Sequence, residues 1–359
     1  SRGAGIDGGP AWNDEAPAAL PPPLDVHVAV TSQCPVACAG CYQDARPDGE
    51  HVPRESLART LRELGSSGVF HVAFGGGEPL AREDLGEIAD LSRASGLVPV
   101  VTTSGLGLTR ERAASLSGFA QVNVSHDGVA GGYRAVRGFD AAHTAERAIE
   151  LLVGAGVPVG VNLVLTRETF DQVEATAARA RDLGARELQL LRYKPAGRAA
   201  SLEYLARRLT QAQNDALHGL LERLVAAHGE ALSVRIDCAL VPMLVPHVRD
   251  ARALSRWGVF GCEAGRHLAA VQRDGALTPC SFVTDTHDVF SSFEAAWRDD
   301  PALSAFRAFV DAPPEPCASC ALRSACRGGC KVVSAHLEHA MSPDPECSRV
   351  RAHRQGQAS

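Results

Sequence analysis

Short apolar runs alternate with longer amphipathic segments over the first half of this chain. The strand-like runs, rich in Val and Leu, lie at 28–31, 69–74, 98–102, 121–125, 157–165 and 188–193. The segments with helical length and apolar spacing lie at 54–64, 82–95, 110–116, 142–155 and 169–183. Alternation of this kind predicts βα units and an α/β fold with a parallel sheet covered by helices.

The rest of the chain has a different character. A further helix is expected at about 209–228, and the sequence beyond it is rich in cysteines and turns. We therefore predict four regions: a flexible, Gly-, Ala- and Pro-rich segment at 1–24, a barrel at 25–200, a helical bridge at 201–235 and a small Cys-rich domain at 236–359. Six βα units are too few to close the usual eight-stranded barrel.

Composition excludes several classes of function. The 359 residues are 45% hydrophobic with a formal net charge of −6, and Lys and Arg are scattered, which argues against a nucleic-acid surface. No run approaches 18 apolar residues and no signal peptide is evident, so we expect a soluble, cytoplasmic protein without membrane partners. Ten of the eleven cysteines fall into metal-type spacings, which favours a reducing compartment.

The first metal-type pattern is the Cys34, Cys38 and Cys41 triplet, which directly follows the first strand-like run. Three thiolates are one too few for a closed tetrahedral zinc site, although a distant fourth ligand would complete a zinc knuckle. They suit a [4Fe-4S] cluster that keeps one iron free for another ligand.

This CxxxCxxC loop after a first strand resembles the signature of radical S-adenosylmethionine (radical SAM) enzymes. The resemblance implies an open, partial (β/α)6 TIM-like barrel. It also implies that the free iron chelates SAM and that an electron from the cluster splits SAM into a 5′-deoxyadenosyl radical.

Motifs at the ends of later strands resemble the SAM-binding elements of the same family. The implied SAM contacts are Gly76, Gly77 and Glu78 for the amino group, Ser104 for the ribose, Ser125 for the carboxylate or ribose, Asn162 for the nucleoside, and Tyr42 for the adenine. Tyr42 is proposed because Gly40 stands where relatives often have an aromatic residue. Arg192, Tyr193 and Lys194 are either substrate contacts or solvated surface. His71 and His126 are expected to be structural.

Seven cysteines in the tail resemble the SPASM extension of radical SAM enzymes, which holds two auxiliary iron–sulfur clusters. Gly275 would turn a small hairpin between the first two of them. The resemblance implies one cluster on Cys317, Cys320, Cys326 and Cys347, and another on Cys262, Cys280 and Cys330. With the loop cluster this makes three [4Fe-4S] clusters in addition to SAM; a pair of structural zinc ions is the alternative.

The fourth ligand of the second set is open. Relatives with full ligation add a cysteine a few residues upstream, where this chain has Arg256 and Trp257. Either Cys238 is the fourth ligand of the cluster, or one iron has no protein ligand and can bind a substrate group. We carry the open iron forward as the hypothesis. Cys238 would then be a buried free thiol.

The resemblance implies a peptide substrate, because SPASM relatives mostly crosslink or oxidise peptides. Ser281 follows Cys280 at the position where sulfatase-maturing relatives have an Asp that acts as a base, so a sulfatase-maturing activity is disfavoured. The catalytic base of this chain is not identified. We expect a maturase of a ribosomal precursor peptide, with a flavodoxin or ferredoxin as electron donor. Fewer than 30 residues precede the first strand, so a leader-recognition protein would be separate or unnecessary. A small-molecule dehydrogenase or epimerase, and a non-catalytic iron–sulfur or zinc-binding protein, are the alternatives.

Overall fold

A computed structural model of the protein describes residues 20–129, 131–201, 203–249, 251–259, 261–284 and 289–357. Most of the segment predicted to be flexible, at 1–24, lies outside these residues.

One sheet organises the described residues, with nine strands in the order β7-β6-β5-β4-β3-β2-β1-β8-β9. The strands are β1 (Asp25–Thr31), β2 (His71–Gly76), β3 (Val98–Thr103), β4 (Gln121–Ser125), β5 (Val159–Leu165), β6 (Glu187–Arg192), β7 (Ser233–Ile236), β8 (Leu268–Val271) and β9 (Leu277–Thr278). All neighbouring strands from β7 to β8 are parallel, and β9 alone is antiparallel to its neighbour. The predicted α/β fold with six leading βα units is confirmed.

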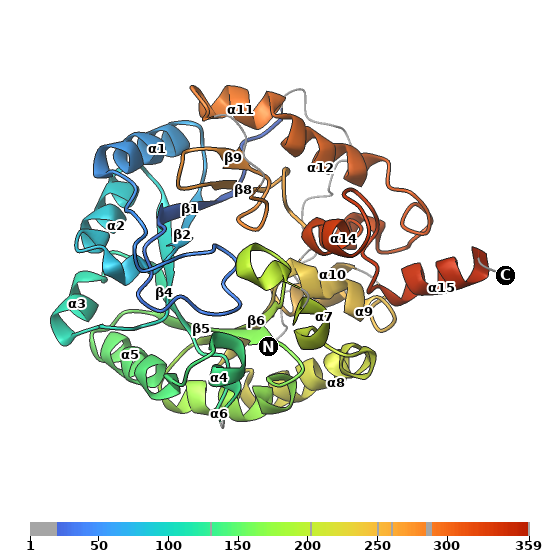
Figure 1. Ribbon diagram of the computed structural model, residues 1–359, viewed down its shortest axis with the longest axis horizontal. Coiled ribbons are helices and arrows are strands. Elements are labelled where there is room, and N and C mark those ends of the chain that lie inside the picture. Colours follow the sequence, from blue (N-terminus) through green and yellow to red (C-terminus); the bar gives the residue numbers. More distant parts are fainter. Residues whose placement is uncertain are drawn as a thin grey trace, which may run out of the picture.

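Helices cover the outer side of this sheet. Figure 1 shows them as an arc around the strands, followed by the C-terminal helices beside the open end. The helices of the first part are α1 (Arg54–Ser66), α2 (Leu85–Ala94), α3 (Arg110–Ser115), α4 (Gly132–Arg137), α5 (Ala142–Gly154), α6 (Val173–Asp182), α7 (Glu203–Arg207) and α8 (Gln211–His228). Those of the second part are α9 (Val241–Leu244), α10 (Ala251–Ser255), α11 (Phe293–Asp299), α12 (Pro301–Asp311), α13 (Arg323–Cys326), α14 (Lys331–Leu337) and α15 (Ser348–Gln357).

The two faces of the sheet differ in polarity. In β1 the residues Val26, Val28 and Val30 are at most 2% exposed and belong to the main hydrophobic core. The intervening Asp25 and His27 point to the other side, where their side chains are about one-third exposed. Because strand side chains alternate between faces, apolar packing against the helices leaves the concave inner face polar and accessible.

The structure adds elements that the sequence pattern did not predict. Strands β7 and β8 have four residues each, too few for a clear alternation, and α4 is six residues long between left-handed Gly131 and Gly138. Strand β8 lies in the region predicted as a separate Cys-rich domain, yet it pairs directly with β1, from Asp25 opposite Leu268 to Val28 opposite Val271. The sheet is therefore continuous across the expected boundary at 236.

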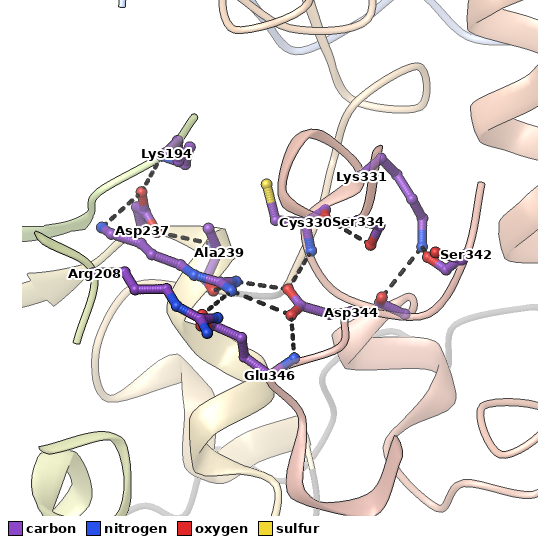
Figure 2. A network of polar contacts seen from close by, with 12 residues as sticks. Lys194, Arg208, Asp237, Ala239, Cys330, Lys331, Ser334, Ser342, Asp344 and Glu346 are labelled. Carbon is purple, nitrogen blue, oxygen red and sulfur yellow. Dashed lines mark hydrogen bonds and ion pairs between the residues drawn. The ribbon is translucent and has the colours of Figure 1, made fainter. Parts of the chain in front are cut away.

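A buried ionic network joins the barrel to the tail (Figure 2). Arg192, at the end of β6, donates from Nη1 to Asp344 Oδ2 at 2.6 Å and from Nη2 to Glu346 Oε2 at 2.5 Å. Its Nη1 also donates to the carbonyl of Ala239 at 2.9 Å, and Arg208 forms a second ion pair with Glu346. Arg192 is only 5% exposed, so the expectation that it is a substrate contact or solvated surface is wrong.

We expect the Arg192→Met substitution to lower the free energy of unfolding by about 3–5 kcal/mol, because it leaves the buried Asp344 without its cation and removes one of the two cations that pair with Glu346. Urea denaturation of the metal-free protein measures this change. The matched control is Arg223→Met, which breaks the exposed Arg223–Glu174 pair and should cost no more than about 1 kcal/mol. Equal effects of the two substitutions would contradict the structural role of Arg192.

Candidate active site

The Cys34, Cys38 and Cys41 triplet lies on one loop at the carboxyl end of β1, where parallel barrels place their ligands. All three thiols are half-buried, and Cys38 interacts electrostatically with the other two. The loop is folded by its own backbone: Cys34 N donates to Arg46 O at 2.8 Å, and Cys41 N donates to Cys38 O at 3.2 Å. The structure thus places the three thiols on one loop, and their role as cluster ligands stays a prediction.

The glycine-rich loop after β2 is bonded directly to the start of this cysteine loop. Gly77 N donates to Thr31 O at 2.6 Å, and Glu78 N donates to Gln33 O at 2.8 Å. A Cβ at Gly76 would lie 2.4 Å from Thr31 O, and one at Gly77 would lie 2.1 Å from Gln33 O. These glycines are required here for the close approach of two backbones, in addition to any contact with a ligand.

Glu78 is buried and linked to the end of the next strand. Its Oε1 accepts from Thr103 Oγ1 at 2.5 Å and Leu80 N at 3.0 Å, and its Oε2 accepts from Ser104 N at 2.8 Å and Ser104 Oγ at 2.5 Å. The structure therefore brings Glu78 and Ser104 together, as expected for two contacts of one ligand. Their assignment to SAM stays a prediction.

Ser125 and Asn162 lie opposite one another in the β4–β5 register, and both are buried. Asn162 Nδ2 is 3.5 Å from Thr102 Oγ1, while its buried Oδ1 has no hydrogen-bond partner among the described residues. A buried acceptor without a partner costs free energy unless a ligand supplies the donor. This atom fits the predicted contact with a nucleoside.

Arg137 on α4 was missed by the sequence analysis. Its Nη1 lies 3.8 Å from Cys38 Sγ, and its Nε donates to Asp127 Oδ2 at 2.5 Å. Asp127 is fully buried and also accepts from Val164 N at 2.8 Å, so it orients the arginine. Burial raises the pKa of the Cys38 thiol, and the Arg137 charge counteracts this by favouring the thiolate that a metal requires.

The turn after β6 holds the cysteine loop from the other side. Arg198 Nε donates to Cys38 O at 2.9 Å, its Nη1 donates to Asp44 Oδ1 at 2.7 Å and Ala45 O at 3.0 Å, and its backbone N donates to Cys41 O at 2.9 Å. Gly197 has φ +54°, and a Cβ there would lie 2.6 Å from Cys41 O. Sequence had marked this turn only as a family-like motif.

Aromatic residues link the cysteine loop to the tail. Tyr42 stacks on Phe282 with ring centroids 4.3 Å apart, and Lys194 Nζ lies 4.1 Å from the centroid of Phe282. Tyr193, instead, is beside Gly40: a Cβ at Gly40 would lie 3.1 Å from the Tyr193 hydroxyl. The predicted adenine contact of Tyr42 stays a prediction, and Tyr193 fills the space next to Gly40.

The tail cysteines form two sets. Cys317, Cys320, Cys326 and Cys347 line a single cavity together with Asp344 and Arg349. Among the described residues, no group of three or more His, Cys, Asp or Glu side chains is arranged to hold a single metal ion. A [4Fe-4S] cluster is several atoms wide, so cysteines that surround a cavity fit it.

The other set comprises Cys262, Cys280 and Cys330, in which the Cys280 thiol interacts electrostatically with both of the others. Gly275, with φ +87°, turns the β8–β9 hairpin that leads to Cys280. Burial raises the pKa of the Cys280 thiol to about 12. Two buried ammonium groups lie near these sulfurs: Lys194, which is paired with Asp237, and Lys331, whose pKa burial lowers to about 8.

A cavity on the inner barrel wall connects the glycine-rich loop with the tail. It is lined by Gly75, Gly76, Tyr42, His27 and Ser281, among others. His27 Nδ1 lies 3.2 Å from Ser281 Oγ, and Asp25 Oδ1 lies 2.9 Å from His71 Nδ1. The sequence analysis missed this cluster of polar side chains because its members come from β1, β2 and the tail. The alternation of side chains along β1 and β2 could have indicated that Asp25, His27 and His71 share the inner face of the sheet. His71 has a partner within the fold, as does His126, which lies 3.4 Å from Glu146.

Comparisons with known proteins agree with this arrangement. The family model described as the Radical SAM superfamily matches residues 28–180. The mycofactocin maturase MftC of Mycolicibacterium smegmatis is 30% identical over 91% of this chain and 83% of its own length. The PqqA peptide cyclase of Ruegeria pomeroyi is 29% identical over 96% of this chain and 92% of its own. The structure of Streptococcus suis SuiB bound to precursor peptide SuiA superposes with a TM-score of 0.73 at 18% identity, over 91% of this chain and 76% of that one.

Fold and site together define the class: an open-barrel α/β enzyme with a cysteine triplet and a glycine-rich loop at the carboxyl ends of its first two strands. The chain belongs to the radical SAM superfamily. Membership implies a [4Fe-4S] cluster and SAM at the cysteine loop. No helix in the described part of the chain has the length and apolar character needed to cross a bilayer.

We expect Arg198→Ala to loosen the cysteine loop. Loss of one hydrogen bond from a charged group is worth at least roughly 1.4 kcal/mol, so alkylation of the loop thiols in the metal-free protein should accelerate at least about tenfold. Peptide mass mapping after timed iodoacetamide treatment measures this rate. The control is Arg46→Ala on the same loop, whose side chain forms an ion pair with the exposed Asp44. An unchanged alkylation rate in Arg198→Ala would refute the role of Arg198 in holding the loop.

Ionisation of Asp25 on the barrel wall makes the stability of the fold depend on pH. Burial opposes its ionisation, but hydrogen bonds and positive charge from His27 and His71 outweigh burial and hold its pKa well below the ordinary 3.8. Its stabilising effect is therefore fully present above about pH 4 and is lost as the pH falls below that value. We expect the stability difference between wild type and Asp25→Asn, measured by urea denaturation, to be larger at about pH 5 than at about pH 3, where the carboxylate is being protonated. A difference that keeps growing as the pH falls below about 4 would be inconsistent with this assignment.

Proposed function

We propose that this enzyme is a radical SAM maturase that abstracts hydrogen from a peptide, most simply a ribosomal precursor peptide, and leaves it crosslinked or oxidised. The observation that carries the proposal is the similarity to a mycofactocin maturase at 30% identity over 91% of this chain. The PqqA peptide cyclase relative supports the same substrate class.

The residues at the mouth of the barrel fit this chemistry. When bound, the [4Fe-4S] cluster and SAM supply a 5′-deoxyadenosyl radical able to abstract hydrogen from an unactivated C–H bond. Cys34, Cys38 and Cys41 would hold the cluster, and Arg137 would favour their thiolate forms. Glu78 and Ser104 would orient the amino-acid and ribose ends of SAM, and Asn162 Oδ1 would accept from its nucleoside.

The chain also supplies a place for the substrate. The polar inner face of the barrel can bind peptide amides and carbonyls, which an apolar wall would leave without partners. The cavity lined by Gly76, Tyr42 and Ser281 adjoins the SAM loop, so a peptide bound there would lie next to the reactive carbon. The stacked rings of Tyr42 and Phe282 cover this side of the site and exclude water.

The two cysteine sets of the tail would hold auxiliary [4Fe-4S] clusters, one on Cys317, Cys320, Cys326 and Cys347 and the other around Cys262, Cys280 and Cys330. A flavodoxin or ferredoxin would deliver electrons, which places the reaction in the reducing environment of the cytoplasm.

The test is reductive SAM cleavage followed by peptide analysis. We expect anaerobically reconstituted protein with dithionite to form 5′-deoxyadenosine, and a precursor peptide encoded beside its gene to lose the mass of two hydrogen atoms for each crosslink or oxidation. Chromatography and tandem mass spectrometry measure the two products.

The Cys38→Ala variant is the control and should form neither product, because the loop cluster then lacks a ligand. Absence of SAM cleavage by the wild-type protein would refute the radical mechanism. Cleavage with oxidation of an alcohol or sugar, and no peptide change, would replace the peptide substrate by a small molecule.

A further inference from the structure

A fourth cysteine lies within the set formed by Cys262, Cys280 and Cys330. Cys238 begins the 3₁₀ turn η4 (Cys238–Leu240), which directly follows β7. Its side chain is hydrogen-bonded to that of Cys262, although 23 residues separate them in sequence. Cys238 also packs against the main hydrophobic core, so its contact with the Cys262 thiol, and not its burial, is what distinguishes it from an inert core cysteine.

The same turn also packs against the third member of the set. Ala239, the residue after Cys238, forms a buried cluster with Cys330 and Val333. The turn containing Cys238 and the loop containing Cys330 therefore adjoin each other, and the four sulfurs come from four separate segments that meet at one place.

Polar contacts fix the relative position of these segments. Asp237 Oδ1 accepts from Ala239 N at 2.8 Å, and Arg192 Nη1 donates to Ala239 O at 2.9 Å. Arg192 also donates to Asp344, whose Oδ2 accepts from Cys330 N at 3.0 Å. Figure 2 shows this chain of contacts from Asp237 and Ala239 to Asp344 and Cys330. The turn is thus held in place before any metal binds.

The local charge suits a site of four thiolates. Lys194 is buried, pairs with Asp237 and interacts electrostatically with both Cys238 and Cys330. Lys331 interacts in the same way with Cys262. Buried thiolates need nearby cations. Lys194 supplies one beside Cys238 and Cys330, and Lys331 supplies another beside Cys262.

We propose that Cys238 is the fourth protein ligand of the auxiliary cluster held by Cys262, Cys280 and Cys330. The inference rests on the proposed function only in that the site holds an iron–sulfur cluster. It replaces the hypothesis of an open iron: with four cysteines this cluster has no vacant position for a substrate group, and its contribution is restricted to electron transfer.

The experiment uses a full-length background variant, Cys34→Ala, Cys38→Ala and Cys41→Ala, so that only tail clusters remain. We expect the electron paramagnetic resonance spectrum of the dithionite-reduced protein to be unchanged by added cyanide, because no iron is open. Adding Cys238→Ala should make the spectrum cyanide-sensitive, and mild oxidation should then produce a [3Fe-4S] signal.

The control is Ser334→Ala on the same background, which removes a hydroxyl that donates to Cys330 O at 3.0 Å but removes no thiol. It should keep the cyanide-insensitive spectrum. Cyanide sensitivity of the background protein itself, which does not depend on whether the Cys238 variant folds, would overturn the inference. So would a Cys238→Ala spectrum identical to the background.

Failure of the proposed function is distinguishable from failure of this ligand assignment. Wild-type protein that does not cleave SAM while Cys238→Ala alters the tail spectrum would refute the function and keep the ligand. Protein that holds zinc and no iron in its tail would overturn the ligand assignment as an iron–sulfur site.

Discussion

The hydrogen bonds between the glycine-rich loop and the end of β1 determine where the reactive part of this enzyme lies. Gly77 and Glu78 bond to Thr31 and Gln33, immediately before the first cysteine, and a Cβ at Gly76 or Gly77 would collide with that backbone. Arg198 bonds the same loop from the β6 side. The triplet is therefore anchored at both edges of the barrel mouth, although Ala37 within it has the left-handed φ of +48°. The position of the thiols at this site therefore depends on the barrel as well as on the loop's own backbone hydrogen bonds.

The contrast between the two sheet faces explains how one fold supports both stability and a polar reaction chamber. Val26, Val28 and Val30 take part in the core between strands and helices. The hydrophobic core lies on the helix-covered face of the sheet. The positions on the inner face can therefore carry polar residues such as Asp25, His27 and Asn162. A closed eight-stranded barrel fills its interior with side chains. An open sheet does not require this, and a substrate as large as a peptide can enter.

The strands and helices of the barrel were predictable because each is long enough to show its own periodicity. The cysteine triplet could be located because its spacing is local along the chain, whereas the division of the tail cysteines into two sets came from the family resemblance and stays a prediction. Contacts across the sequence had no such signal: Arg137 reaches Cys38 from 99 residues away, and Arg192 meets Asp344 from 152 residues away. An arginine at a strand end is ordinarily solvated. The burial of Arg192 could not be predicted, because it requires carboxylate partners that are far away in the sequence. Cys238 could be singled out as the one cysteine outside the motifs, but its neighbours could not.

The cysteine-rich tail is far from β1 in sequence, but the pairing of β8 with β1 makes it part of the central sheet. Removing it would expose the edge of the first barrel strand, whose unpaired amides and carbonyls would then be open to association with other chains. Tails exchanged between homologous enzymes would have to preserve both this strand register and the carboxylates that neutralise Arg192. The two halves of the enzyme are consequently expected to diverge in concert during evolution, as a single inheritable unit, and not as interchangeable modules.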